Sequence, residues 1–220
     1  MMYILFSETA VMGAAIFGTV YGLIRCRSGK MPLYALMSVM GLLCMALGSF
    51  HTVIRVMTSV PVEGVFQTGT LGTVGAFMFF FSSNYGQIDL LVDDRSAANR
   101  KYRLTAGALS ALLLVSSILA VRGSAEAGEV FGYILCSLSV SMAAYFNIKH
   151  LIIPDIEGGV VSCLRGHNAL ILCMGLMCTV KNAALSRDGY FFCALSAIPQ
   201  CILTAACFPV LERGVRRWSE

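Results

Sequence analysis

The chain has 220 residues, of which 57% are hydrophobic and only 13% are charged, and its mean hydropathy is +0.77. This composition lies outside the range of ordinary soluble domains and predicts an integral membrane protein whose first partner is the lipid bilayer. The net charge of +4 gives no indication of nucleic-acid binding, because retention of Lys and Arg on one side of a membrane accounts for it. We therefore expect no nucleic-acid partner.

Seven apolar segments are each long enough to cross a bilayer, which takes roughly 20 residues at about 1.5 Å per residue. The first segment is apolar directly after Met1 and contains Glu8, which a signal peptide would not place in its apolar region. The sequence thus predicts an all-α integral membrane protein, a seven-transmembrane helix bundle that forms a single polytopic domain over residues 1–220. The expected spans are residues 2–24, 33–57, 65–85, 104–121, 130–153, 161–185 and 190–211.

The distribution of basic residues predicts the orientation, because Lys and Arg are retained on the cytoplasmic side. With the N-terminus outside, 12 of the 16 Lys and Arg residues lie on the inner side. The outer side then keeps only Arg55, Arg122, Lys181 and Arg187. We therefore expect a multi-pass protein of the plasma membrane with the N-terminus outside and the C-terminus in the cytoplasm.

Two segments share a short motif that indicates an internal repeat. Residues 40–44 read MGLLC in the second span, and residues 174–178 read MGLMC in the sixth. A plan of three helices, one linking helix and three further helices would place both motifs in the same direction, so that the two halves would be parallel repeats. Coincidence in a chain rich in Met, Leu, Gly and Ala is the alternative.

Ionisable and amide side chains near the outer ends of several spans form a predicted outer layer. Burial of a charge in hydrocarbon is unfavourable unless it is paired or wet, so such residues are the first candidates for function. The layer could bind a small anionic or zwitterionic ligand or relay a proton; alternatively, Glu8 forms a structural ion pair with Lys181 or Arg55. The candidates are Glu8, His51, Arg55, Gln67, Lys181 and Asn182.

A second, inner layer lies near the cytoplasmic ends of the third, fifth and sixth spans. Its members are Asn84, Gln87, Asp89, Asn147, His150 and His167. Asp89, His150 and His167 have the side chains of a zinc or iron site, although polar residues are also common where helices reach the membrane surface. The pattern identifies no catalytic residue, no metal ligand and no cofactor.

The nine cysteines are scattered through the predicted spans without a C-x-x-C pair. Such a distribution favours neither a disulfide scaffold nor a zinc site. We expect most of them to be small apolar residues of the core.

Pro199, followed by Gln200, falls midway along the last span and predicts a kink there. The kink, the outer layer and the indication of a repeat favour a small-molecule or ion transporter. The alternative is a membrane sensor or accessory subunit that works through a separate membrane protein or a second copy of itself. A third hypothesis is an intramembrane metal-dependent hydrolase that uses the inner layer.

Overall fold

A computed structural model describes residues 2–27, 31–58, 68–93, 96–121, 127–154, 159–187 and 189–219. All of the regular structure in these ranges is helical. Six helices within these ranges are long and apolar enough to cross a membrane, which indicates a multi-pass membrane protein in a lipid bilayer. The described part of the third predicted span is not among the six.

The long helices follow the predicted apolar segments closely. Residues 65–67 of the third predicted span lie outside the described ranges, and the last helix continues beyond the predicted end at residue 211. The helices are α1 (Met2–Cys26), α2 (Leu33–Thr58), α3 (Thr68–Ser83), α5 (Arg100–Val121), α6 (Ala127–Ile152), α7 (Val160–Leu185) and α8 (Tyr190–Ser219).

A π-helical turn interrupts the third hydrophobic segment. This turn, η1 (Asn84–Ile88), follows α3 directly and leads into the short α4 (Asp89–Val92). Ser83 and Asp89, which flank η1, both keep right-handed helical dihedrals, so the backbone remains helical from Thr68 to Val92. We refer to this continuous stretch as the α3–α4 helix.

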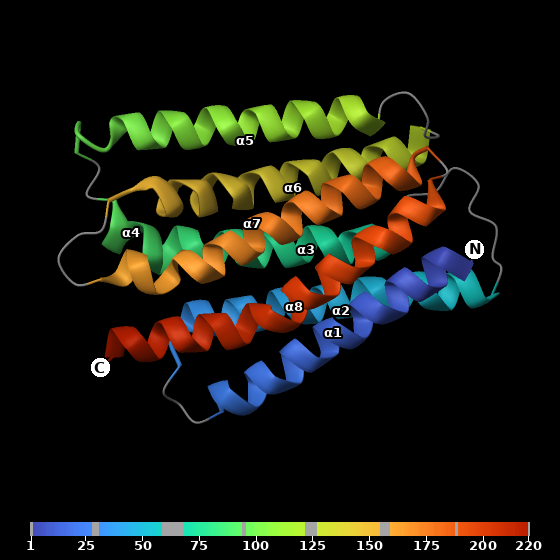
Figure 1. The fold of residues 1–220 in the computed structure, drawn as a ribbon, viewed down its shortest axis with the longest axis horizontal. Helices are drawn as coiled ribbons and strands as arrows, with labels where there is room; N and C mark the ends of the chain where they lie inside the picture. The colour runs from blue at the N-terminus through green and yellow to red at the C-terminus, as the bar shows by residue number, and fades with distance from the viewer. Residues whose placement is uncertain are drawn as a thin grey trace.

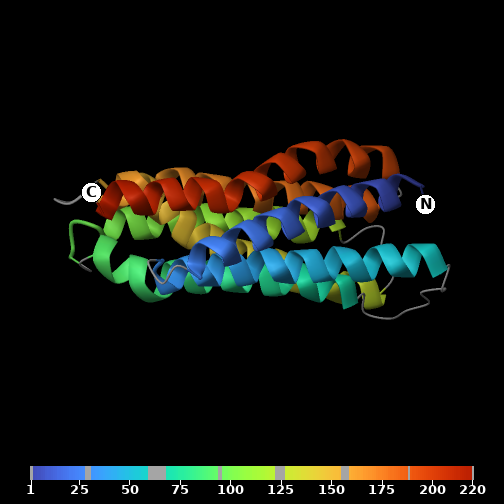
Figure 2. The ribbon, with the colours of Figure 1, turned by 90° about the horizontal axis from the view of Figure 1, so that it is seen from below.

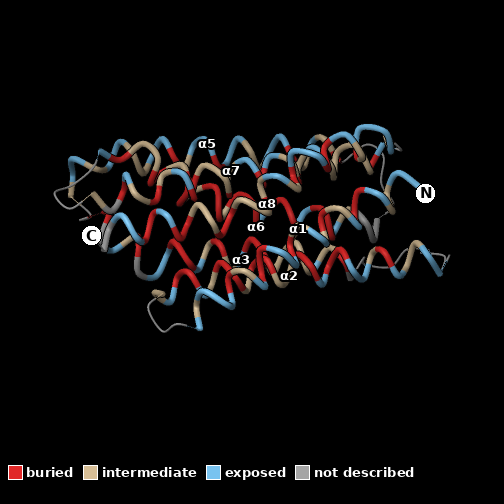
Figure 3. The backbone as a smooth tube through the Cα atoms, turned by 60° about the horizontal axis from the view of Figure 1, so that its bottom comes forward, coloured by how far each residue is buried: buried red, intermediate tan, exposed pale blue. Residues whose placement is uncertain are grey.

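The contacts between helices connect six of them in a closed ring, in the order α1, α2, α3–α4, α6, α7 and α8. The remaining long helix, α5, packs against α6 at the edge of the bundle, outside this ring (Figure 1). Few α5 residues are buried, whereas buried residues are concentrated where the ring helices meet (Figure 3). The chain thus folds as two groups of three helices with α5 between them in sequence. We call α1, α2 and α3–α4 the first triplet, and α6, α7 and α8 the second triplet.

The two triplets meet at two junctions, and in both the adjoining helices run parallel. The first and last helices of the chain begin at the same end of the bundle, and the termini lie at opposite ends (Figure 2). We call these the N-terminal end, where α1 begins, and the C-terminal end, where α8 ends. The contacts that fix the parallel directions are Gly18 with Thr204 and Gly22 with Phe208 between α1 and α8, and Phe81 with Phe146 and Asp89 with His150 between α3–α4 and α6.

Within the first triplet, glycines allow α2 and α3 to approach closely. A Cβ atom at Gly72 would overlap the Cα of Gly48 and would lie 2.6 Å from the carbonyl oxygen of Cys44. Small residues at such crossings let helix backbones touch, which is the usual way in which helices associate in a membrane. A core of large apolar side chains fills the ring, and its most buried members include Leu42, Phe77, Phe80, Ile171, Met174 and Phe208.

Candidate functional site

The first candidate site is an ion pair inside the N-terminal end of the ring. Glu8 of α1 is buried and its Oε1 atom contacts Nζ of Lys181, which reaches across from α7. The side chains of Glu8 and Lys181 are only 7% and 12% exposed, so each charge depends on the other for compensation. The pair therefore joins the first triplet to the second.

Thiols and an amide surround this ion pair. Cys178 and Cys193 both lie within electrostatic range of Glu8 and Lys181. The thiol of Cys193 donates a weak hydrogen bond to Ser7 Oγ at 3.9 Å, and Nε2 of Gln200 donates to Cys178 Sγ at 3.4 Å. These cysteines therefore form part of the polar surroundings of the ion pair, and not only of the apolar core.

The other described residues of the predicted outer layer differ in their surroundings. His51 is exposed on α2, and Arg55 is partly exposed near the end of the same helix. Asn182 forms a hydrogen bond with the thiol of Cys136 on α6. Gln67 lies outside the described residues. The structure thus brings Glu8 and Lys181 together and does not bring His51 into the buried site.

A second cluster of charges lies at the C-terminal end, where α3–α4 meets α6. Nζ of Lys149 contacts Asp89 Oδ1 and lies 3.3 Å from Asp93 Oδ2. Nε2 of His150 lies 3.1 Å from the same Asp89 oxygen. Arg103 donates a hydrogen bond from Nη1 to Asp93 Oδ1 at 2.9 Å. Lys149 is almost fully buried, so the two carboxylates compensate its charge and Arg103 compensates their excess.

A third cluster occupies the other junction, where α1 meets α8 at the same end. Glu212 of α8 is buried and accepts a hydrogen bond from the hydroxyl of Tyr21 at 2.7 Å. Its Oε1 atom also lies 3.3 Å from Nε of Arg25 and accepts a hydrogen bond from Nη2 of Arg216 at 2.6 Å. Glu212 therefore ties α8 to α1 with one cation from each helix.

The two junctions share the same arrangement of charges. In each, an acid on the last helix of one triplet pairs with a cation on the first helix of the other triplet. Asp89 pairs with Lys149 at one junction, and Glu212 pairs with Arg25 at the other. Both pairs lie at the C-terminal end of the bundle, whereas Glu8 and Lys181 connect the triplets at the N-terminal end.

Hydrogen-bonded polar side chains occupy the interior between the two ends. Asn84 donates from Nδ2 to Asn147 Oδ1 at 2.9 Å. Separately, His167 on α7 lies 3.3 Å from Ser38 Oγ on α2 and 3.3 Å from the carbonyl oxygen of Cys207 on α8. The predicted inner layer is thus divided into an asparagine pair, the Asp89 cluster and a separate histidine. Gln87 belongs to η1, but its side chain lies outside the described residues.

The division matters for the metal-site hypothesis. Asp89 and His150 are in contact, but both ring nitrogens of His167 face other partners. In the described parts of the chain, no three His, Cys, Asp or Glu side chains gather closely enough to hold a metal ion. The structure therefore does not bring Asp89, His150 and His167 together as the metal-binding triad that the hydrolase hypothesis requires.

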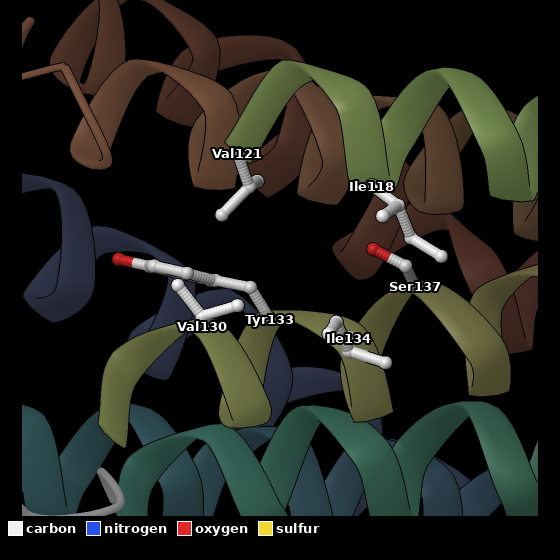
Figure 4. A pocket seen from close by; sticks show the side chains of 6 residues that line it. All are labelled: Ile118, Val121, Val130, Tyr133, Ile134 and Ser137. Atoms are coloured by element: carbon white, nitrogen blue, oxygen red, sulfur yellow. The ribbon is translucent and has the colours of Figure 1, made fainter. Parts of the chain in front are cut away.

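An apolar cavity of about 240 Å³ lies outside the ring, between α5 and α6 (Figure 4). Its walls are formed by Ile118, Val121, Val130, Tyr133, Ile134 and Ser137. The side chains from α5 point down into it and those from α6 form its floor, and most of them are apolar. Such a cavity suits a hydrocarbon chain better than a charged or polar solute.

Comparison with protein-family models, curated proteins and solved structures finds no match to this chain. The site is therefore understood from its own geometry. Sequence reasoning missed Lys149, Asp93 and Glu212 as site residues, because charges near the end of a membrane span can be solvated without a partner. One signal was available: Glu212 precedes Arg216 by four residues, a spacing that extends the last helix beyond its apolar part and pairs the two charges.

Proposed function

We propose that the chain is a transporter of a small solute, in which the two triplets move against each other to open the ring at one end and then at the other. The observation that carries this proposal is the position of the ion pairs that join the triplets, of which Glu8 with Lys181 and Asp89 with Lys149 are largely buried, whereas Arg25 is partly exposed beside Glu212. Pairs between the triplets lie at both ends of the ring, where they would act as two gates. The N-terminal gate is Glu8 with Lys181, and the C-terminal gate consists of Asp89 with Lys149 and Glu212 with Arg25.

The chemistry of buried ion pairs suits such gates. Two charges that compensate each other in a dry site lose little free energy when water enters and hydrates them separately, because desolvation offsets most of their attraction. An apolar seal of the same area would resist opening more strongly. Ion pairs can therefore hold the triplets together in one state and release them in the next without a large barrier.

The order of the ring supports a parallel repeat. Rotation by half a turn about an axis through its centre would exchange the first triplet with the second and would superimpose one parallel junction on the other. The same rotation would place Asp89 on Glu212 and Lys149 on Arg25, so that acid corresponds to acid and cation to cation. We propose that all seven predicted segments, the α3–α4 helix included, cross the plasma membrane, with the N-terminal end outside.

Buried polar groups inside the ring add a route between the gates. Gln200 and Thr204 of α8 lie between the N-terminal ion pair and the middle of the bundle, and Thr204 contacts Met45 on α2. Oε1 of Gln200 has no hydrogen-bond partner among the described residues. A buried polar atom without a partner is unfavourable in a static core, but it is useful where water or a solute passes.

Native cysteines allow a direct test of the two gates. In vesicles exposed to a charged, membrane-impermeant thiol reagent, the combined change Asp89→Asn and Glu212→Gln should increase labelling of Cys207 from the C-terminal side. Glu8→Gln should instead increase labelling of Cys178 from the N-terminal side. Both thiols are buried in the closed ring, so mass spectrometry of the labelled peptides would report its opening.

The matched control is Arg216→Met, which removes an exposed partner of Glu212 and leaves the junction pair with Arg25 in place. This change should leave both thiols protected. If neither gate variant changes labelling, the bundle is static. If Cys136 on α6 becomes labelled together with the other two thiols, the bundle is unfolded. The transporter proposal fails in either case. Reconstituted vesicles should, in addition, accumulate a solute in a saturable manner.

A further inference from the structure

Three buried asparagines from three different helices lie between the gates. They are Asn84 at the start of η1, Asn147 on α6 and Asn168 on α7, and each is at most 1% exposed. We call them the asparagine cluster. The hydrogen bond from Asn84 to Asn147 joins two of its members directly.

The helix register places the third member at the same level. A Cβ atom at Gly175 of α7 would meet Val140 of α6 at 2.9 Å and Phe77 of α3 at 3.5 Å, so these positions mark one level of the bundle. Each asparagine lies seven residues, or two helical turns, from one of these three positions in the direction of the C-terminal end. Since seven residues return a helix to nearly the same face, the register predicts that Asn168 faces α6 and α3, as Gly175 does.

The amide groups of the cluster are not satisfied by one another. Oδ1 of Asn84 and both Oδ1 and Nδ2 of Asn168 are buried without a hydrogen-bond partner among the described residues. Together these groups leave a donor and two acceptors without partners inside the bundle. Buried amides are rarely left in this state unless a bound molecule completes their hydrogen bonds.

Two features of the backbone mark the same place. The π-helical turn η1 begins at Asn84, and such turns are found frequently at functional sites. The residues that precede Asn84 and Asn168 in the chain belong to one hydrogen-bonded network, in which Ser83 and His167 both contact Ser38 Oγ. This network holds α3 and α7 against α2 and so fixes the directions of the two amides.

We propose that the asparagine cluster is the solute-binding site of the transporter and that the solute is uncharged, with hydroxyl or amide groups that both donate and accept hydrogen bonds. This inference rests on the proposed function and specifies its substrate class. The described members of the site carry no formal charge, and the nearest acid, Asp89, is already paired with Lys149 and His150. A cationic solute would find no free counter-ion there, and the cation that precedes Asn168 by one turn on α7, Arg165, already donates a hydrogen bond to the Ile153 carbonyl oxygen. A neutral polar solute would satisfy the unpartnered amides.

The test compares uncharged solutes with their phosphorylated counterparts. Purified protein in detergent is mixed with glycerol, a hexose or a nucleoside, and in parallel with the phosphate ester of each, and its melting temperature is recorded. We expect at least one uncharged solute to raise the melting temperature by about 5 °C near saturation, and its ester to have no such effect. Uptake of the same solutes into vesicles is measured separately.

Asn168→Leu provides the decisive variant, because it removes two unpartnered polar atoms at nearly constant volume. We expect it to abolish the shift caused by the solute while the protein without solute melts at the same temperature or higher. Asn147→Leu is the contrasting variant, since it strands Asn84 Nδ2 and should lower the melting temperature without solute. Ser141→Ala is the matched control, because it removes a buried, unpartnered oxygen elsewhere on α6 and should keep the full shift.

The outcomes separate this inference from the proposed function. A shift that Asn168→Leu abolishes, without uptake of any solute, would support the binding site and would overturn the transporter proposal. Uptake or shifts confined to the phosphate esters, or shifts that survive Asn168→Leu, would overturn the asparagine site and leave the transporter proposal standing. Neither shifts nor uptake with any of these solutes would overturn both.

Discussion

Glu8 of α1 and Lys181 of α7 form a buried ion pair although their helices belong to different triplets. The pair spans the interior of the ring at its N-terminal end. Each charge is deprived of water and has the other as its compensating group, so loss of either partner would leave a buried charge.

We expect Glu8→Gln to destabilise the protein by about 3 kcal/mol, because it leaves the Lys181 ammonium buried without a counter-charge. The double change of Glu8→Gln with Lys181→Met should recover most of this loss, since an apolar side chain of similar length replaces the stranded cation. The measurement is thermal unfolding in detergent, followed by a thiol-reactive dye that detects the buried cysteines as they become exposed.

Arg216→Met is the control for this cycle. Arg216 pairs with Glu212, but its side chain is 61% exposed, so its removal should change stability by no more than about 0.5 kcal/mol. Equal effects of Glu8→Gln and Arg216→Met would contradict the view that burial makes the Glu8 pair important.

The contact between α2 and α3 predicts a sharp difference between two glycine substitutions. Gly72→Ala should destabilise the protein by about 1–3 kcal/mol, because the new methyl group would overlap the backbone of α2 at Gly48. Gly13→Ala on the exposed face of α1 meets no atom within 4 Å, and should stabilise the helix by up to about 1 kcal/mol. If both variants melt alike, the close crossing of the two helices is wrong.

The charge distribution predicts which loops face outward. Cysteine introduced at Ser124 should react with an impermeant reagent added outside intact cells, whereas cysteine at Ser28 or Ser96 should react only after the cells are opened. Ser28 and Ser124 lie outside the described residues, so the experiment tests topology without relying on their geometry. The reverse pattern would show that the N-terminal end faces the cytoplasm.

The position of His167 predicts the metal content of the protein. Its ring nitrogens face Ser38 and the Cys207 carbonyl, away from the contact between Asp89 and His150. We therefore expect purified protein to contain no stoichiometric zinc or iron by elemental analysis, and His167→Ala to leave that content unchanged. Stoichiometric metal that is lost in His167→Ala would favour the hydrolase hypothesis over the transporter.

The apolar segments could be predicted from the sequence because a bilayer imposes a minimum length and apolarity on each helix. Glu8 could be recognised as well, since a carboxylate among apolar residues must find a partner. Which partner it finds depends on the order of helices around the ring, and no local pattern contains that order. From the sequence, both Lys181 and Arg55 were possible partners. In the structure it is Lys181, reaching across from α7, that contacts Glu8.

The MGLLC and MGLMC motifs also show that a local sequence pattern does not determine which helices become neighbours. A Cβ at Gly41 would meet Phe80 and Ala76 on α3, the chain neighbour of α2 in the ring. A Cβ at Gly175 would meet Val140 and Phe77, on α6 and α3. The two glycines therefore face different neighbours, and the order of the ring supports a repeat more strongly than the motif that first indicated it.

The position of α5 outside the ring has a consequence for how such a chain could arise. A ring built from two parallel triplets needs no seventh helix for its packing. However, a triplet has an odd number of helices, so the chain leaves the first triplet on the opposite side of the membrane from the side on which a parallel second triplet must begin. One added crossing corrects this. If the proposed repeat is correct, α5 is a tether, and the single chain is equivalent to two three-helix subunits that are joined end to start and meet across the same two junctions.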